Sequence, residues 1–202
     1  MESERKMKFI WLNSPIFALL FFSAVPRAMS VFETKQTWTY ELKTIETSTS
    51  DLDKFSFGEF KVERISRGVY AASGSFTINV DFVEGDSNMI ETHTYRSENG
   101  KDFKPIALQT PRIHIYEYFN TFYKDYAMET LKDCSNMPVF EGKFEPPLEK
   151  KTYVLEKCQF EQSAFPPYLQ EGFYKADIVG TGDVEWHFIF TVLVEPNKGV
   201  MY

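Results

Sequence analysis

The chain has 202 residues, of which 43% are hydrophobic and 25% are charged, and its formal net charge is −7. This length is sufficient for one domain with a substantial core. The acidic balance argues against any partner held by attraction to phosphate groups, so no nucleic-acid partner is expected.

The first thirty residues have the pattern of a secretory signal peptide. Basic residues at Arg5, Lys6 and Lys8 precede an apolar run from Phe9 to Val25, and small residues follow near position 30. A membrane anchor is the alternative, but polar residues interrupt the run, which falls short of about 20 clean apolar residues. We therefore expect residues 1–30 to be cleaved and residues 31–202 to be exported to the extracellular space as a single domain. The removed segment holds four of the 22 basic and two of the 29 acidic residues, which leaves a balance of 18 to 27, or −9.

Strand signals dominate the remainder. In residues 70–82 apolar and small side chains share one parity and polar side chains the other, as in an antiparallel strand with one dry face. Similar runs are Trp38 to Thr47, Phe55 to Ile65, Met89 to Tyr95, Tyr153 to Phe160, Phe173 to Val179 and Val184 to Val194, with Pro105 to Thr110 as a weak edge. Asn99-Gly100 and Gly182-Asp183 predict tight hairpin turns, and Glu84-Gly85-Asp86 a further break. The predicted fold is mainly β, a two-sheet antiparallel β-sandwich or β-cup of about eight strands.

One inserted segment breaks the alternation and predicts an amphipathic helix of about five turns. Thr110 as cap and Pro111 in the first turn predict where it begins. Its aromatic face must be buried on the sandwich or across the mouth between the sheets. The residues at helical spacing are Ile115, Phe119, Phe122 and Tyr126.

Cys134 and Cys158 are the only cysteines. Because exported chains keep disulfides, we expect this pair to be oxidised, with a stabilisation of about 3.5 kcal/mol from loop closure. Free or intermolecular thiols are the alternative.

Aromatic residues make up 17% of the chain. They either form a large solid core or line an apolar cavity between two separated sheets. An acyl chain of about a dozen carbons would gain on the order of 10 kcal/mol in such a cavity before ordering costs. An apolar interior volume of several hundred cubic ångströms would indicate a ligand site, and tight packing would indicate a core. The predicted ligand-binding residues are Phe76, Ile78, Phe82, Phe119, Phe122, Tyr126, Tyr168, Phe188 and Phe190.

Signals for catalysis are weak. His93, His114 and His187 lie far apart and in no metal-ligand spacing, and no nucleophile elbow or phosphate-binding loop is recognisable. We therefore expect neither enzymatic activity nor a metal or cofactor.

Several short patterns carry a resemblance to a known family. They are Cys158-x-Phe160, Pro167-Tyr168-Leu169-x-x-Gly172-x-Tyr174, and Arg64-x-x-Arg67-Gly68-x-Tyr70 leading into Gly74-x-Phe76. Their order resembles the ganglioside-activator type of lipid-binding protein and the related insect chemosensory protein A and B families. Those proteins form a β-cup with an apolar cavity, and the ganglioside activator has several disulfides where this chain can form one.

The resemblance implies a secreted carrier for a lipid or a small hydrophobic, pheromone-like ligand. It also implies that the Cys134–Cys158 bridge ties the strand after the helix to the loop before that strand, and that the loop Phe165 to Leu169 flanks the cavity mouth. That loop could equally fold back on the core. The alternative function is a non-catalytic module that docks on a receptor, an enzyme or a membrane surface through this loop.

Overall fold

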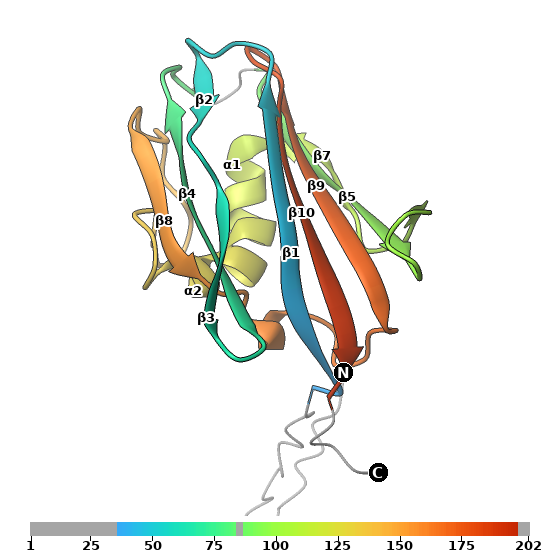
Figure 1. Ribbon diagram of the computed structural model, residues 1–202. Helices are drawn as coiled ribbons and strands as arrows, with labels where there is room; N and C mark the ends of the chain where they lie inside the picture. Colours follow the sequence, from blue (N-terminus) through green and yellow to red (C-terminus); the bar gives the residue numbers. More distant parts are fainter. Residues whose placement is uncertain (1–35, 84–86, 198–202) are drawn as a thin grey trace, which may run out of the picture. The chain divides into compact units, whose positions relative to one another are not determined.

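A computed structural model describes residues 36–83 and 87–197 (Figure 1). This part of the chain is mainly β, with two antiparallel sheets and one helix, which confirms the predicted fold class. The predicted signal segment, residues 1–30, and the predicted break at residues 84–86 lie outside the described residues.

The larger sheet has six strands. Its path runs β1-β10-β9-β5-β6, and β7 pairs with β5 on the edge that β6 also uses. Trp186 of β10 lies opposite Gly180 of β9, and Phe188 lies opposite Ile178, so these residues share the inner face. The strands are β1 (Trp38–Thr49), β5 (Met89–Ser97), β6 (Lys104–Pro105), β7 (Thr110–His114), β9 (Gly172–Thr181) and β10 (Trp186–Pro196).

The smaller sheet is built around β4. β8 pairs with one edge of β4, and β2 and β3 follow each other along the opposite edge. The single strand predicted for residues 55–65 is therefore interrupted, because the Gly58 amide donates to the Ser75 carbonyl and the Phe60 ring lies over Gly74. The strands are β2 (Phe55–Phe57), β3 (Lys61–Ser66), β4 (Val69–Ile78) and β8 (Thr152–Cys158).

A single 17-residue helix bridges the two sheets. Its first turn, α1 (Ile115–Tyr118), contacts β5 and β7, and its last turn, α2 (Met128–Leu131), contacts β8. The central segment, η1 (Phe119–Ala127), is π-helical. In Figure 1 the helix lies behind β3 and β1, across the space that separates the sheets. Among the described residues, no helix has the length and apolar character needed to span a bilayer.

The predicted start of the helix at Thr110 and Pro111 is wrong. Residues 110–114 form β7, whose Ile113 lies opposite Ile90 of β5, and the helix begins at Ile115 with the His114 side chain accepting from the Tyr116 amide. Proline lacks an amide proton but fits an edge strand such as β7, so pairing with β5 outweighs the local helix-start pattern.

The strand predicted for residues 70–82 ends earlier than predicted: β4 ends at Ile78 and not at Phe82. Beyond β4, the Asn79 amide donates to the Lys54 carbonyl, and Phe82 forms an isolated bridge with Leu148. Phe82 nevertheless stays in the core, with 2% of its surface exposed.

The predicted disulfide is confirmed. Cys134 follows the helix and Cys158 ends β8, and the Cα atoms of the pair are 5.3 Å apart. The bridge thus joins the C-terminal end of the helix to the smaller sheet. After β8 a short 3-10 turn, η2 (Gln162–Ala164), leads into the proline-rich loop.

Candidate functional site

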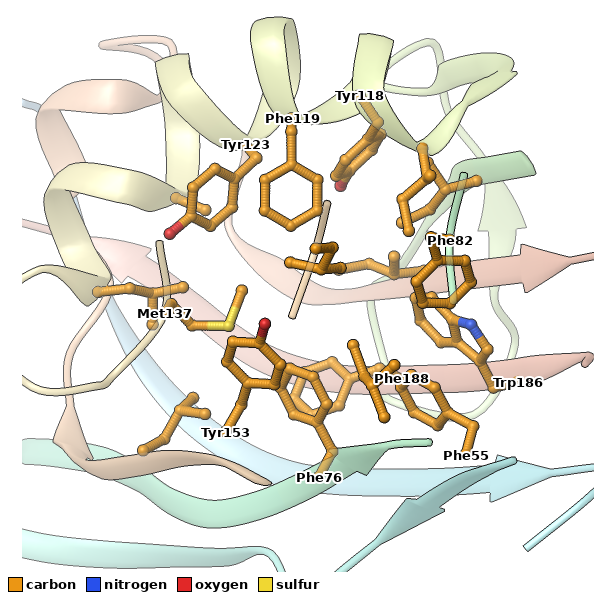
Figure 2. Close-up of a pocket in the computed structure, with 18 of the residues that line it drawn as sticks. Phe55, Phe76, Phe82, Tyr118, Phe119, Tyr123, Met137, Tyr153, Trp186 and Phe188 are labelled. Atoms are coloured by element: carbon orange, nitrogen blue, oxygen red, sulfur yellow. The ribbon is translucent and has the colours of Figure 1, made fainter. Parts of the chain in front are cut away.

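An apolar cavity of about 180 Å³ lies between the two sheets under the helix (Figure 2). β4 and β8 supply one wall, β9 and β10 another, and the helix closes the third side. An apolar cavity of about 150 Å³ is large enough to hold benzene. The space therefore fits a compact molecule of roughly six to eight heavy atoms, and the dozen-carbon chain considered from the sequence does not fit it as it stands.

Four stacked rings span the cavity from one sheet to the other. Tyr153 of β8 stacks on Phe76 at 5.1 Å, Phe76 on Phe55 at 5.6 Å, and Phe55 on Trp186 of β10 at 5.1 Å between ring centroids. The indole of Trp186 lies on Gly180, where an added Cβ would overlap the ring. Each stacked pair of this kind contributes about 0.5–1.5 kcal/mol to stability beyond the burial of its surface. The row of four rings thereby sets the distance between the two sheets.

The helix presents to the cavity a stripe of residues four apart. The stripe consists of Ile115, Phe119, Tyr123, Ala127 and Leu131, all of which line the space. The wider turn of a π-helix, with bonds from i to i+5, rotates each residue less than an α-helical turn does, so positions four apart stay aligned.

The α-helical spacing used for the prediction therefore chose the wrong face in part. Phe122 and Tyr126 do not line the cavity; they belong to a neighbouring stripe in which Phe122 lies 5.7 Å from Tyr118 and 6.3 Å from Tyr126 between ring centroids. Tyr126 in turn contacts Phe165 at 6.1 Å and is 45% exposed.

Five of the nine predicted ligand-binding residues line the cavity: Phe76, Ile78, Phe82, Phe119 and Phe188. Phe190 instead stacks on Phe160 at 4.9 Å. Tyr168 is 71% exposed, and its neighbours Phe165 and Leu169 pack on a separate core cluster around Trp38. The loop from Phe165 to Leu169 thus folds back on the core and does not border the cavity.

Several lining residues escaped the sequence reasoning. Tyr153 and Leu155 share one parity of a predicted strand, so alternation alone could have found them. Tyr123, Ala127 and Met137 had no such signal, because the π-helical turn and the loop after the helix decide their positions.

No charged side chain among the described residues lines the cavity, and the polar groups of its lining are three tyrosine hydroxyls and the indole N–H of Trp186. The Tyr123 hydroxyl donates to the Pro138 carbonyl at 2.7 Å, and the Tyr153 hydroxyl donates to the Glu149 carbonyl at 2.9 Å. Burial raises the pKa of Tyr123, with a smaller contribution from Tyr153. Burial, and then the charge of Glu149, raises the pKa of Tyr153 to about 12.

The histidines lie away from this cavity. His187 and His93 have the strand parity of the outer face of the larger sheet, where His187 Nδ1 is 3.0 Å from Asp177 Oδ1 and its Nε2 is 3.5 Å from Glu185 Oε1. Both ring nitrogens of His187 thus face carboxylates. Within residues 36–83 and 87–197, no group of three or more His, Cys, Asp or Glu side chains could hold a metal ion.

Comparison with known proteins adds one finding. No curated protein matches the chain. Residues 90–176 are similar to the family described as "Protein of unknown function (DUF1091)". The matched range runs from β5 through the helix and the disulfide into β9, so it contains the helical side of the cavity and β8, but neither β4 nor β10.

Proposed function

We propose that the protein is a secreted binding protein that holds one small hydrophobic molecule between its two sheets. The observation that carries this proposal is the cavity of about 180 Å³, whose lining within the described part of the chain consists of apolar and aromatic side chains without a charged residue. Each methylene group moved from water into such a space contributes about 0.8 kcal/mol. Binding therefore needs no charged anchor, and the ligand is compact.

The family resemblance supports the same proposal from another direction. The patterns around Cys158, Gly172 and Gly74 resemble proteins that carry or present apolar molecules, including insect chemosensory proteins. A pheromone-like or other small chemosensory ligand fits the size of the cavity better than a long acyl chain does. Because one fold serves many functions, this part of the proposal depends on direct measurement.

The direct test is titration of the purified protein with toluene or methylcyclohexane, followed by calorimetry and by NMR of the Trp186 indole. The blocking variant is Ala127→Phe, which places a ring from the helix into the cavity. The control is Tyr168→Ser, at a position that is 71% exposed and outside the cavity.

We expect saturable binding to the wild type and to Tyr168→Ser, and at least a tenfold loss in Ala127→Phe. Mass spectrometry of organic extracts of the protein as purified should identify any co-purified molecule. If no compact apolar compound binds, the cavity is a packing defect and the carrier function is wrong.

A second candidate function is docking on a partner protein through the proline-rich loop. The observation that favours it is the exposure of Tyr168 beside Phe165 and Leu169, which are themselves anchored in the core. An exposed aromatic side chain on a fixed loop is typical of a binding hot spot. Loss of a partner in Tyr168→Ser, with ligand binding intact, would favour docking over carriage.

A further inference from the structure

The cavity contains one hydroxyl whose proton is not given to the backbone. Tyr123 and Tyr153 both donate to backbone carbonyls, so neither has a proton left for a ligand. Tyr118 also lines the cavity, and Figure 2 shows its hydroxyl directed toward the interior beside Phe119. Its hydrogen-bond partner is the Thr92 hydroxyl on β5.

The bond between Tyr118 and Thr92 is long. Its oxygen atoms are 3.4 Å apart, whereas hydroxyl pairs normally lie at about 2.7–2.8 Å. Thr92 can donate to the Tyr118 oxygen while Tyr118 donates to a third group, because each hydroxyl is both a donor and an acceptor. Thr110 lies opposite Thr92 across the β5–β7 pair, and its buried Oγ1 has no hydrogen-bond partner among the described residues. This corner of the molecule therefore holds more hydroxyl groups than satisfied hydrogen bonds.

We propose that the ligand is a neutral molecule with an acceptor oxygen, such as a ketone, an aldehyde, an ester or an ether, and that this oxygen accepts a hydrogen bond from the Tyr118 hydroxyl. The inference rests on the proposed function, and it names the ligand class and the residue that orients the ligand. The hydrocarbon part of the ligand then lies against Phe119 and Phe188, and its oxygen lies at the end where the helix meets β5.

The surroundings select a neutral ligand. A carboxylate at this position would be buried without a cation, since none of the Lys, Arg or His side chains in residues 36–83 and 87–197 lines the cavity. Burial of an unpaired charge is far more costly than burial of a hydrogen-bonded carbonyl. Burial also raises the pKa of Tyr118, which outweighs the opposing effect of its hydrogen bond with Thr92, so the hydroxyl keeps its proton and remains a donor.

The experiment compares two probes of nearly the same shape, cyclohexanone and methylcyclohexane, with cyclohexanecarboxylate as the charged probe. Dissociation constants are measured by calorimetry for the wild type, Tyr118→Phe, Thr92→Val and Tyr123→Phe. The last variant is the matched control, because it removes a cavity hydroxyl that already donates to the backbone. Thr92→Val provides a second measurement if Tyr118→Phe does not fold.

We expect Tyr118→Phe to weaken cyclohexanone binding about fivefold and to leave methylcyclohexane binding unchanged. Thr92→Val should also weaken cyclohexanone binding, but by less. Tyr123→Phe should leave the ratio of the two dissociation constants, cyclohexanone to methylcyclohexane, unchanged. Cyclohexanecarboxylate should not bind any of these proteins at neutral pH.

Three results would count against these proposals, and each points to a different error. If both neutral probes bind and Tyr118→Phe affects them equally, the oxygen contact is wrong while the carrier function stands. If the carboxylate binds as well as the ketone, the restriction to neutral ligands is wrong. If neither neutral probe binds the wild type, the carrier function fails and this inference fails with it.

Discussion

The inner face of the larger sheet is covered differently at its two ends. At one end Trp186 and Phe188 of β10 border the cavity, where Trp186 stacks on Phe55 and Phe188 contacts Phe60 edge-on. At the other end Trp38 of β1, Tyr174 of β9 and Val194 of β10 form a packed cluster with Phe165 and Leu169. Both ends have the same alternation of aromatic and polar residues, yet the apolar cavity lies at the first, hollow end.

The two ends differ in the segment that covers the sheet. At the packed end Trp38 Nε1 donates to the Pro166 carbonyl at 2.9 Å, and the Tyr174 hydroxyl donates to the Gln170 carbonyl at 2.8 Å. The Thr37 amide and hydroxyl both donate to the Pro167 carbonyl. These bonds hold the proline-rich loop against the sheet. At the hollow end Tyr153, Phe76, Phe55 and Trp186 stack on one another, and the Tyr123 and Tyr153 hydroxyls donate to the Pro138 and Glu149 carbonyls. Stacking fixes the spacing between the sheets without filling the volume beside the rings.

The largest effect is expected from removing the disulfide, which joins the end of the helix to the end of β8, two elements that line the cavity. The bridge closes a loop with a sequence separation of 24, so the double variant Cys134→Ala with Cys158→Ala should lose about 3.5 kcal/mol of unfolding free energy on the chain-entropy model. Urea unfolding of the oxidised wild type and of the variant measures this loss. Unchanged midpoints would mean that packing at the hollow end is sufficient without the bridge.

The second-largest effect is expected from alkaline pH, which should lower the free energy of unfolding through the tyrosines that line the cavity. The pKa of Tyr153 is about 12 in the folded protein against an ordinary value of 10.0, so the folded state binds the proton more tightly than the unfolded chain does. The stability from this group is therefore fully present below pH 10 and is lost as the pH rises through about 12.

Tyrosinate absorbance and circular dichroism, recorded together during a titration, should show loss of structure as the buried tyrosines ionise. Tyr153→Phe should shift this transition to higher pH. A variant that unfolds at the same pH as the wild type would contradict the role given to Tyr153.

The two ends also differ in how far they could be predicted from the sequence. The alternation in residues 186–194 predicts a strand with one dry face. In β10, Trp186 and Phe188 of that face line the cavity, and Val192 and Val194 belong to the cluster around Trp38. The same alternation cannot tell whether Phe190 faces a cavity or stacks on Phe160, because that depends on which segment covers the sheet. Periodicity identifies the side of a strand that is buried, and the tertiary partner decides whether the burial is complete.

The helix shows a second limit of sequence reasoning. Its existence follows from aromatic residues at helical spacing, but its cavity face depends on the π-helical turn, which places Tyr123 and not Phe122 in the lining. Its start depends on the pairing of Ile113 with Ile90 across β7 and β5, a contact between distant parts of the fold. At the start of the helix, long-range pairing overrides local propensity.

A third prediction compares added volume in packed and hollow surroundings. Ala72 of β4 is 5% exposed beside the end of β8, whereas Ala127 of the helix borders the cavity. Ala72→Leu should cost about 1–3 kcal/mol through overpacking, while Ala127→Leu should be neutral or stabilising because its added carbons enter empty space. Thermal unfolding of the two variants gives the comparison directly. Equal destabilisation would show that the cavity is not open to side chains from the helix.

The smallest effect expected comes from single hydroxyl deletions at the two ends. Tyr174→Phe removes a donor that leaves the Gln170 carbonyl unpaired, and it should cost about 1 kcal/mol. Tyr118→Phe removes only the 3.4 Å contact with Thr92, so the unliganded protein should lose less than about 0.5 kcal/mol. Chemical denaturation resolves the two values if both variants are measured beside the wild type.

The order of the two losses matters more than their size. A hydroxyl that stabilises the fold is committed to the backbone, whereas one that costs nothing to remove is available to a ligand. A larger loss in Tyr118→Phe than in Tyr174→Phe would reverse this assignment and make Tyr118 a structural residue.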